Sequence, residues 1–511
     1  MVDIRLDRGR PVPLYRQIVA QVLAQIADGR LPPGAPLPAE RTLAAHLRVN
    51  RTTIVAAYQE LVATGRVEAR VGRGTQVCEA ANPAPPPLAW STLFGPTAER
   101  LQLAARRDLL GARQLPGRHS APGTRLDQRT ISFGTGTPDP TLFPLARFRE
   151  ALDLALAEAG GDLFGYGPVQ GEPALREELV AWMARRAIRV TPERVVVTHG
   201  SQQGLDLLAR LFIEVGDAIV VESPTYLGAL QVFRGAGARL IAVPLDDEGL
   251  RADLLAPLLA RHRPKFIYTV PTFQNPTGIT MSQRRRETLL DLAARLGVPI
   301  VEDDPYGELS FGEAPPPPLA ALDRHNLVIH VGTMSKILLP GIRLGWLSAP
   351  PPVAEALGAL RQTIDLHPNG PLQRALGIFL ARGWLDDHLA LLRPAVRARR
   401  DALLAALAAS APPGMAWNTP AGGSFVWVRL PCGLRASALA VEAAREGVAF
   451  IAGEAFSPTG DERDALRLNF AGVPEADIAE GVRRLMIAIR RLSPATRRGA
   501  PRPGEDCRPV V

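Results

Sequence analysis

Lys336 is one of only two lysines in this 511-residue chain, since the other 57 of its 59 basic side chains are arginine. It lies in the segment GTMSKILLPGIRLGW, directly after the apolar run LVIHVGT, which predicts a place near the C-terminal end of a strand. Hydroxyls at Thr333 and Ser335 and the guanidinium of Arg343 flank it. These groups suit a lysine that forms a Schiff base beside a bound phosphate. The alternative for an isolated lysine is an ordinary surface position.

Two other segments supply what pyridoxal 5'-phosphate (PLP) chemistry requires. VVVTHGSQQG predicts a strand that runs through Gly200 into a helix, so the N–H groups of Ser201 and Gln202 would face an anion. VPIVEDD predicts a strand that ends in carboxylates. We select Asp303 because Tyr306 follows it at a suitable interval. A carboxylate here would hold a pyridine nitrogen protonated, which makes the ring an electron sink.

Two further side chains fit the same cofactor. Tyr226, in SPTY, offers a flat face for stacking against a ring, and Asn275, in NPTG, can hydrogen-bond a phenolic oxygen. Each residue alone is more often structural, so the prediction of a PLP site depends on the combination.

The elements that must position these residues follow a regular order. From Ile131 onward, short apolar runs alternate with helical stretches, which predicts a largely parallel α/β sheet. From about residue 350 a long helical segment is followed by GSFVWVRL, GVAFIAG and ALRLNFA, and by a closing helix near Ala476 to Leu492. This second pattern predicts a smaller α+β lobe.

The front of the chain has a different pattern. Apolar residues at helical spacing from Leu14, the segment AERTLAAHL, and a stretch that begins after a possible N-cap at Asn50 predict three helices. VEARV and TQVC then flank a turn at Gly72 to Gly74, which predicts a two-stranded wing.

This arrangement can place the N-terminus of the third helix in the major groove of DNA. Arg51, Thr52 and Thr53 would then meet bases or phosphates. Arg41 and Arg73 could add phosphate or minor-groove contacts. From periodicity alone, a small helical protein-interaction domain is an equal alternative.

Composition and charge set the outer limits. Residues 1–80 and 81–130 each carry +4 of the net charge of +8, an excess compatible with a polyanionic partner or with a solvated basic face. No apolar run is long enough to span a membrane and no secretory signal is visible, so we expect a cytoplasmic protein without a membrane partner. The three cysteines lack metal-ligand spacing, so no metal site is expected. We predict a DNA-binding domain at 11–79, a Pro/Arg-rich linker at 80–130, a PLP-binding domain at 131–493 and a disordered tail at 494–511.

Resemblance to known families makes the predictions for both parts of the chain more specific. The run PLYRQIVAQVLAQIADGRLPPGAPLPAERTLAAHLRVNRTTIVAAYQELVATGRVEARVGRGTQV resembles the winged helix-turn-helix of GntR-type regulators over its whole length. That resemblance implies a double-stranded DNA operator as partner. It makes Arg41, Arg51, Thr53 and Arg73 the best candidates for contact.

Residues 131–493 resemble the fold type I aminotransferases of class I and II. By that likeness Lys336 carries the aldimine, Asp303 pairs with the pyridine nitrogen and Tyr226 stacks on the ring. The likeness also assigns contacts to O3' and to the phosphate, which fall respectively to Tyr306 and Asn275, and to Ser201, Gln202, Thr333, Ser335 and Arg343. Tyr166, in FGYGPVQG, would reach the phosphate of the neighbouring subunit, which implies a homodimer. Arg467, in ALRLNFA, would bind the substrate carboxylate; the alternative is an arginine paired with a structural acid.

A GntR-type head on an aminotransferase-like body is similar to the layout of MocR-type regulators. The resemblance implies a regulator that senses an amino acid or amine through the PLP aldimine, with weak or no transaminase turnover. Two alternatives stay open. One is a working aminotransferase with an accessory DNA-binding domain, since the catalytic set is intact. The other is a regulator of vitamin B6 metabolism that senses PLP itself.

Overall fold

A computed structural model describes residues 2–9, 11–70, 74–78, 95–103 and 130–492. The chain forms two compact units, which divide between Leu93 and Phe94. The wing tip with Arg73, most of the predicted linker and the predicted tail lie outside the described residues. Residues 96–103, inside the predicted linker, are helical.

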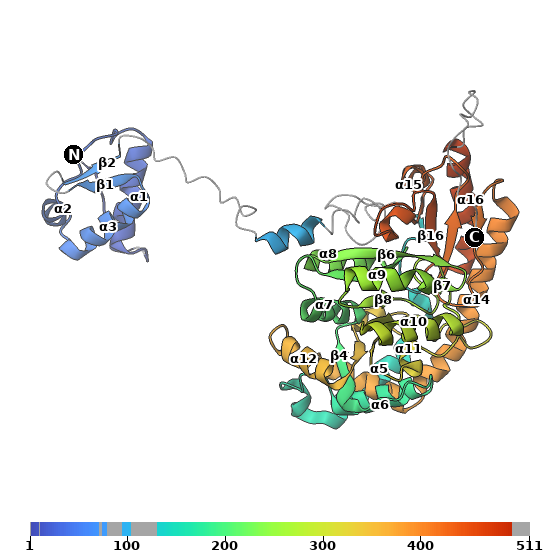
Figure 1. The fold of residues 1–511 in the computed structure, drawn as a ribbon. Helices are drawn as coiled ribbons and strands as arrows, with labels where there is room; N and C mark the ends of the chain where they lie inside the picture. Colours follow the sequence, from blue (N-terminus) through green and yellow to red (C-terminus); the bar gives the residue numbers. More distant parts are fainter. Residues whose placement is uncertain (1, 10, 71–73, 79–94, 104–129, 493–511) are drawn as a thin grey trace. The chain divides into compact units, whose positions relative to one another are not determined.

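The smaller unit contains three helices followed by a two-stranded antiparallel sheet (Figure 1). These elements are α1 (Leu14–Ala27), α2 (Glu40–Leu47), α3 (Arg51–Ala63), β1 (Val67–Arg70) and β2 (Gly74–Val77). Their apolar faces share one core that includes Ile18, Ile54 and Leu61. Val2 and Ile4 also belong to this core, although they precede the expected start of the domain at residue 11. The unit is a winged helix, as the sequence predicts.

The larger unit is built on an eight-stranded sheet with the order β4-β11-β10-β9-β8-β5-β6-β7. The strands are β4 (Val195–Thr198), β5 (Ala218–Ser223), β6 (Arg239–Asp246), β7 (Gly249–Leu250), β8 (Ile267–Thr269), β9 (Ile300–Asp303), β10 (Val328–Thr333) and β11 (Gly345–Ser348). The five central strands β10, β9, β8, β5 and β6 are mutually parallel. β11 is antiparallel and lies between β10 and β4. The segment that joins β10 to β11 is too short for a crossover helix, so the chain reverses direction there.

Helices cover this sheet and bury its aliphatic strands (Figure 1). They include α7 (Ser201–Phe212), α8 (Leu227–Ala236), α9 (Leu255–His262), α10 (Gln283–Leu296), α11 (Leu319–Leu322) and α12 (Pro351–Gln362). Two more, α5 (Leu145–Ala159) and α6 (Pro173–Ala184), both pack against α13 (Gly370–Ala381). Because helices flank a parallel sheet, the strands read as continuous apolar runs.

The second lobe has a four-stranded antiparallel sheet in the order β12-β13-β16-β15. Its strands are β12 (Ala416–Trp417), β13 (Phe425–Arg429), β15 (Ile451–Ala452) and β16 (Ala465–Asn469), and its helices are α14 (Trp384–Ser410), α15 (Ala436–Arg445) and α16 (Glu475–Leu492). A short parallel pair, β3 (Ile131–Ser132) and β14 (Val448–Ala449), ties the start of the unit to this lobe. The architecture is the fold type I arrangement with a smaller α+β lobe, as expected.

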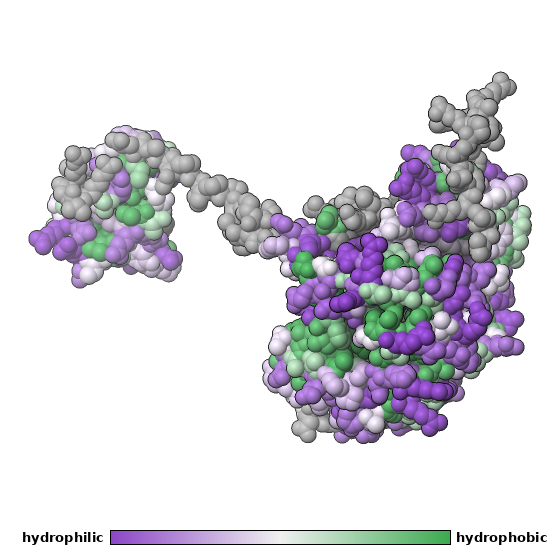
Figure 2. All heavy atoms as spheres, viewed as in Figure 1, coloured by the Kyte–Doolittle hydropathy of each residue, from purple (hydrophilic) through white to green (hydrophobic). Residues whose placement is uncertain are grey.

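The visible surface of both units is mostly hydrophilic, with hydrophobic residues gathered in smaller patches (Figure 2). Among the described helices, none is both long and apolar enough to cross a membrane.

Candidate cofactor and DNA-binding sites

A cavity of about 650 Å³ opens beside the carboxyl ends of the central strands, where α/β sheets usually bind ligands. It brings together nine of the residues predicted for the cofactor: Ser201, Gln202, Tyr226, Asn275, Asp303, Tyr306, Ser335, Lys336 and Arg343. Thr333 lies directly behind this wall, where its hydroxyl donates to the Ser335 hydroxyl at 3.0 Å. Segments separated by well over a hundred residues therefore converge because their strands end at one edge of the sheet.

One end of the cavity is built to hold an anion. α7 begins at Ser201, so its first N–H groups have no partner within the helix and point out of its positive end. Arg343 lies beside them and donates to the carbonyl oxygens of His199 and Pro340 at 3.1 and 3.2 Å. Gly200 has φ +79°, and a Cβ there would lie 2.6 Å from the Arg343 guanidinium. Glycine is therefore required for the close approach of the guanidinium to the helix end.

Asp303, at the end of β9, supplies a buried carboxylate. The Tyr268 hydroxyl donates to its Oδ2 at 2.7 Å, whereas the buried Oδ1 has no hydrogen-bond partner among the residues that the structure describes. Burial raises the pKa of Asp303 to about 6, and the hydrogen bond from Tyr268 opposes that rise. An unpaired buried oxygen that lines a cavity calls for an N–H donor from a ligand.

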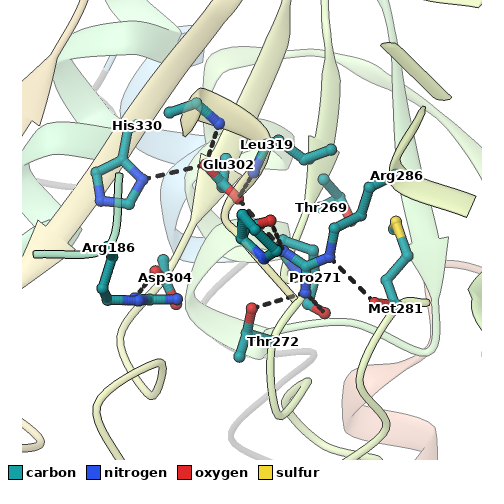
Figure 3. Close-up of polar contacts among 12 residues, drawn as sticks. Arg186, Thr269, Pro271, Thr272, Met281, Arg286, Glu302, Asp304, Leu319 and His330 are labelled. Atoms are coloured by element: carbon teal, nitrogen blue, oxygen red, sulfur yellow. Dashed lines mark hydrogen bonds and ion pairs between the residues drawn. The ribbon is translucent and has the colours of Figure 1, made fainter. Parts of the chain in front are cut away.

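The acids on either side of Asp303 are engaged elsewhere (Figure 3). Glu302 accepts from the backbone N–H of Leu319 at 2.6 Å and lies 3.2 Å from His330 Nδ1. Asp304 pairs with Arg186. Neither Glu302 nor Asp304 lines the cavity. Of the three consecutive carboxylates, Asp303 is therefore the one that lines this cavity.

Lys336 follows β10 and lines the cavity, with its Nζ donating to the carbonyl oxygen of Gly136 at 2.6 Å. Its charge lowers the pKa of Asp303, against the larger effect of burial. The positive charge of the Lys336 amine therefore favours the ionised form of the Asp303 carboxylate.

The remaining polar groups form the walls. Asn275 Nδ2 donates to the Tyr306 hydroxyl at 3.5 Å, and burial raises the pKa of Tyr306. The Tyr226 hydroxyl donates to Gln202 Oε1 at 3.0 Å, which ties the aromatic wall to the first turn of α7. These contacts fix the orientation of the walls.

Arg467, on β16, is buried behind Asn275 and does not line the cavity. Its Nη1 donates to Asn275 Oδ1 at 2.9 Å and its Nη2 to the Gly134 carbonyl at 3.1 Å, while Nε has no partner in the described part of the chain. The guanidinium lies 4.1 and 4.9 Å from the ring centroids of Phe425 and Phe456. Burial lowers the pKa of Arg467 to about 10. Within the described residues no carboxylate pairs with it, so the alternative of a structural ion pair finds no support.

Tyr166 lies apart from the cavity. The residue is 87% exposed, and its ring forms a T-shaped pair with the ring of His367, 5.6 Å away between centroids. Tyr166 therefore does not line the cofactor cavity of its own chain.

In the smaller unit, four of the five predicted DNA-contact residues lie on α2 and on the first turn of α3, and Arg73 lies outside the described residues. Arg41, Arg51 and Thr52 are exposed, and Thr53 is half-buried. Asn50 caps α3 by accepting from the N–H of Thr52 at 3.1 Å. Arg51 pairs with Glu40 at 2.9 Å, a contact that periodicity could not reveal.

Several cavity residues were not singled out from the sequence. They are the wall residues Thr137, Pro138, Pro140, Phe143, Val270, Pro305, Pro340 and Gly341. Most lie in irregular segments, including the 3₁₀ turns at Pro140–Leu142 and Pro340–Ile342. Tyr268 was also missed, although a tyrosine within the apolar strand run FIYTV was a usable signal, because a buried hydroxyl requires a partner.

Comparison with known proteins agrees with this geometry. Residues 129–485 match the model for aminotransferase class I and II, and residues 14–77 match the model for bacterial regulatory proteins of the gntR family. The HTH-type transcriptional regulator TauR of Rhodobacter capsulatus is 33% identical over 93% of this chain and 96% of its own length. Aromatic-amino-acid aminotransferase 1 of Thermococcus litoralis is 41% identical over 70% of this chain and 88% of its own length.

A solved structure has the same fold as the larger unit of this chain. LysN, the alpha-aminoadipate aminotransferase of Thermus thermophilus, complexed with N-(5'-phosphopyridoxyl)-L-leucine, superposes with a TM-score of 0.72 at 38% identity. The match covers 79% of this chain and 99% of that one. The chain therefore belongs to the class I and II aminotransferase family, in the MocR-type branch that joins this PLP-dependent fold to an N-terminal gntR-family DNA-binding domain.

Proposed function

We propose that the protein is a PLP-dependent transcription regulator that senses an amino acid or amine in its aminotransferase-like domain. The observation that carries this proposal is the convergence of nine predicted cofactor residues on one cavity in a chain that also has a winged-helix domain. When bound, PLP supplies an aldehyde that reacts with amines and a ring that accepts electrons.

The described residues fit this cofactor. Asp303 Oδ1, which is buried and has no partner among the described residues, would accept the pyridinium N–H, and Lys336 would supply the amine. Tyr226 would stack on the ring, and Tyr306 and Asn275 would hold the phenolic oxygen. The phosphate would lie among Ser201, Gln202, Thr333, Ser335 and Arg343, at the positive end of α7.

Arg467 supports an effector that carries a carboxylate. A buried guanidinium without an acid partner is costly, because its desolvation is not offset by an opposite charge. An amino acid carboxylate would provide that charge, and a planar guanidinium can hold both of its oxygens. We therefore favour an amino acid over a simple amine.

The DNA contacts are assigned to Arg41, Arg51, Thr52, Thr53 and Arg73, and the partner to a double-stranded operator. Arg51 would exchange Glu40 for a phosphate. Both side chains are partly exposed, and such pairs contribute at most about 1 kcal/mol, so this exchange is inexpensive.

Further parts of the proposal concern assembly and boundaries. The exposed ring of Tyr166 supports a homodimer in which it reaches the partner's phosphate site. The family matches at 14–77 and 129–485 support a DNA-binding domain at 11–79, whose core the structure extends back to Val2 and Ile4, and a PLP-binding domain at 131–493, joined by the linker. A regulator acts where the chromosome lies, so we place the protein in the cytoplasm.

A titration of the PLP-loaded full chain with a panel of amino acids and amines tests this function. Visible absorbance reports ligand binding to the cofactor, and a coupled assay reports keto acid. A stable spectral change without product supports a sensor. Stoichiometric keto acid, with recovery on addition of a second keto acid, supports the alternative of a working aminotransferase, which the intact set around Lys336 favours. A DNA response to PLP alone would support a sensor of vitamin B6.

A further inference from the structure

An N-terminal arm, residues 2–8, runs along α1 of the winged helix and lies before the segment that matches the gntR family. Three glutamines of α1, each four residues apart, hold every second residue of the arm. The side-chain oxygens of Gln25, Gln21 and Gln17 accept from the backbone N–H of Asp3, Arg5 and Asp7 at 3.2, 3.0 and 2.9 Å.

The same glutamines make a second hydrogen bond to each of these arm residues, so that each pair of hydrogen bonds forms one rung of a ladder between the arm and α1. Their Nε2 atoms donate to the carbonyl oxygens of the same arm residues at 2.6, 2.9 and 2.9 Å. Four helical residues rise about 6 Å and two extended residues span about 6.6 Å, so the two repeats stay in register. The side chains of Val2 and Ile4 are buried in the core of the domain. The arm is therefore an integral part of this fold.

Beyond the last rung of this ladder, the arm reaches the turn between α2 and α3. Arg8 directly follows the last rung, and its Nη2 donates to the carbonyl oxygen of Arg48 at 2.7 Å. Arg48 is the left-handed residue, with φ 49°, that ends α2, and Asn50 two residues later caps α3. The arm thus fastens the turn that orients the helix expected to enter the major groove.

The charges around this turn indicate what the surface binds. Arg8, Arg41 and Arg48 are exposed, and none of them forms an ion pair within the described part of the chain. By contrast, Arg30, at the far end of α1, is paired with Asp28 at 2.7 Å. Uncompensated guanidinium groups beside a helix N-terminus suit phosphate oxygens.

We propose that the arm places Arg8 as a contact to the sugar–phosphate backbone of duplex DNA, beside the turn between α2 and α3. This inference rests on the proposed DNA-binding function. It adds an element outside the family-matched segment, with one cation held in place by the Arg48 carbonyl.

The test compares full-length wild type with Arg8→Ala, Arg8→Lys and the control Arg30→Ala on double-stranded DNA of random sequence, over a series of salt concentrations. Each phosphate contact contributes about 0.9 to the slope of log affinity against log salt. Arg8→Ala should reduce the slope by about one per DNA-binding domain. Arg8→Lys should keep the slope, because the charge remains, and Arg30→Ala should match wild type. Arg30 is a suitable control because the length of α1, roughly 20 Å, separates it from the end of the arm that carries Arg8.

A second variant, Gln17→Met with Gln21→Met, removes two rungs but no charge. It should reduce the slope as Arg8→Ala does, because the arm no longer holds Arg8 in place. An unchanged slope in Arg8→Ala would overturn the inference, whether or not the affinity falls. A fall in affinity at unchanged slope would indicate that the arm has a purely structural role. Absence of DNA binding by the wild type would instead overturn the proposed function itself.

Discussion

Substitution of Tyr268 by phenylalanine should weaken cofactor binding in a pH-dependent way. The change removes the 2.7 Å hydrogen bond to Asp303 Oδ2 and keeps the ring, whose edge packs 5.4 Å from Phe233 between centroids. Burial already raises the pKa of Asp303 to about 6, so its ionised form is less favoured than that of an exposed aspartate. Without the Tyr268 donor, the ionised carboxylate loses the hydrogen bond that the described residues give to this oxygen.

The magnitude follows from the energy of one such bond. A hydrogen bond to a charged group contributes about 1.5 kcal/mol or slightly more, and one pKa unit corresponds to about 1.4 kcal/mol. The pKa of Asp303 should therefore rise by about one unit in Tyr268→Phe. Because PLP binding requires the ionised form, affinity falls as pH drops through this pKa. At pH near 6 the variant should bind PLP several-fold more weakly, and the difference should shrink well above neutrality.

The assay is a PLP titration of the full chain, followed by absorbance, at a series of pH values. Tyr58→Phe is a matched control, since Tyr58 donates a 2.7 Å hydrogen bond to the Pro38 carbonyl in the other unit. Its pH profile for PLP should equal that of wild type. A Tyr268→Phe profile that overlays wild type would refute the view that Tyr268 sets the charge of Asp303.

Four further predictions follow from the same structure. Lys336→Ala should abolish the visible band of the lysine-linked cofactor, and an unchanged spectrum would contradict its role. Arg467→Lys should weaken amino acid binding about tenfold in a spectral titration, because an ammonium lacks the planar fork; simple amines should bind as before. Arg51→Ala should weaken DNA binding in an anisotropy assay without altering PLP occupancy. Burial raises the pKa of Glu222 to about 7, so the folded protein holds a proton that the unfolded chain releases near its ordinary pKa. Its contribution to the free energy of unfolding is therefore full below about pH 4.5 and falls until about pH 7. Glu222→Gln should show a smaller loss of melting temperature than wild type over that range.

Much of the cofactor site could be predicted because its residues sit in short motifs at strand ends. Lys336, Asp303 and Ser201 each follow a buried apolar run, and parallel strands bring their carboxyl ends to one edge. The chemical roles of these residues could be predicted without knowledge of the strand order. The position of β11 between β4 and β10 could not be predicted, because it depends on non-local pairing.

The features that escaped prediction depend on register and on distance in the sequence. Tyr268 is opposite Val301, which places it diagonal to Asp303 across β8 and β9, and only the register reveals that neighbour. Arg467 proved to be held behind Asn275, since its contacts arise between two lobes. The ladder of arm and α1 joins residues up to 22 positions apart, as Asp3 and Gln25 show, through side-chain amides that carry no local signal.

The most direct test of the central claim measures DNA binding and cofactor state on the same sample. Genomic fragments retained by the PLP-loaded full chain would serve as probes, with anisotropy and visible absorbance followed while an amino acid is added. A coupled regulator should change its DNA affinity over the same range of amino acid concentration that changes the spectrum, and Arg467→Lys should shift both curves together. A DNA affinity that stays constant while the cofactor spectrum changes fully would contradict the account.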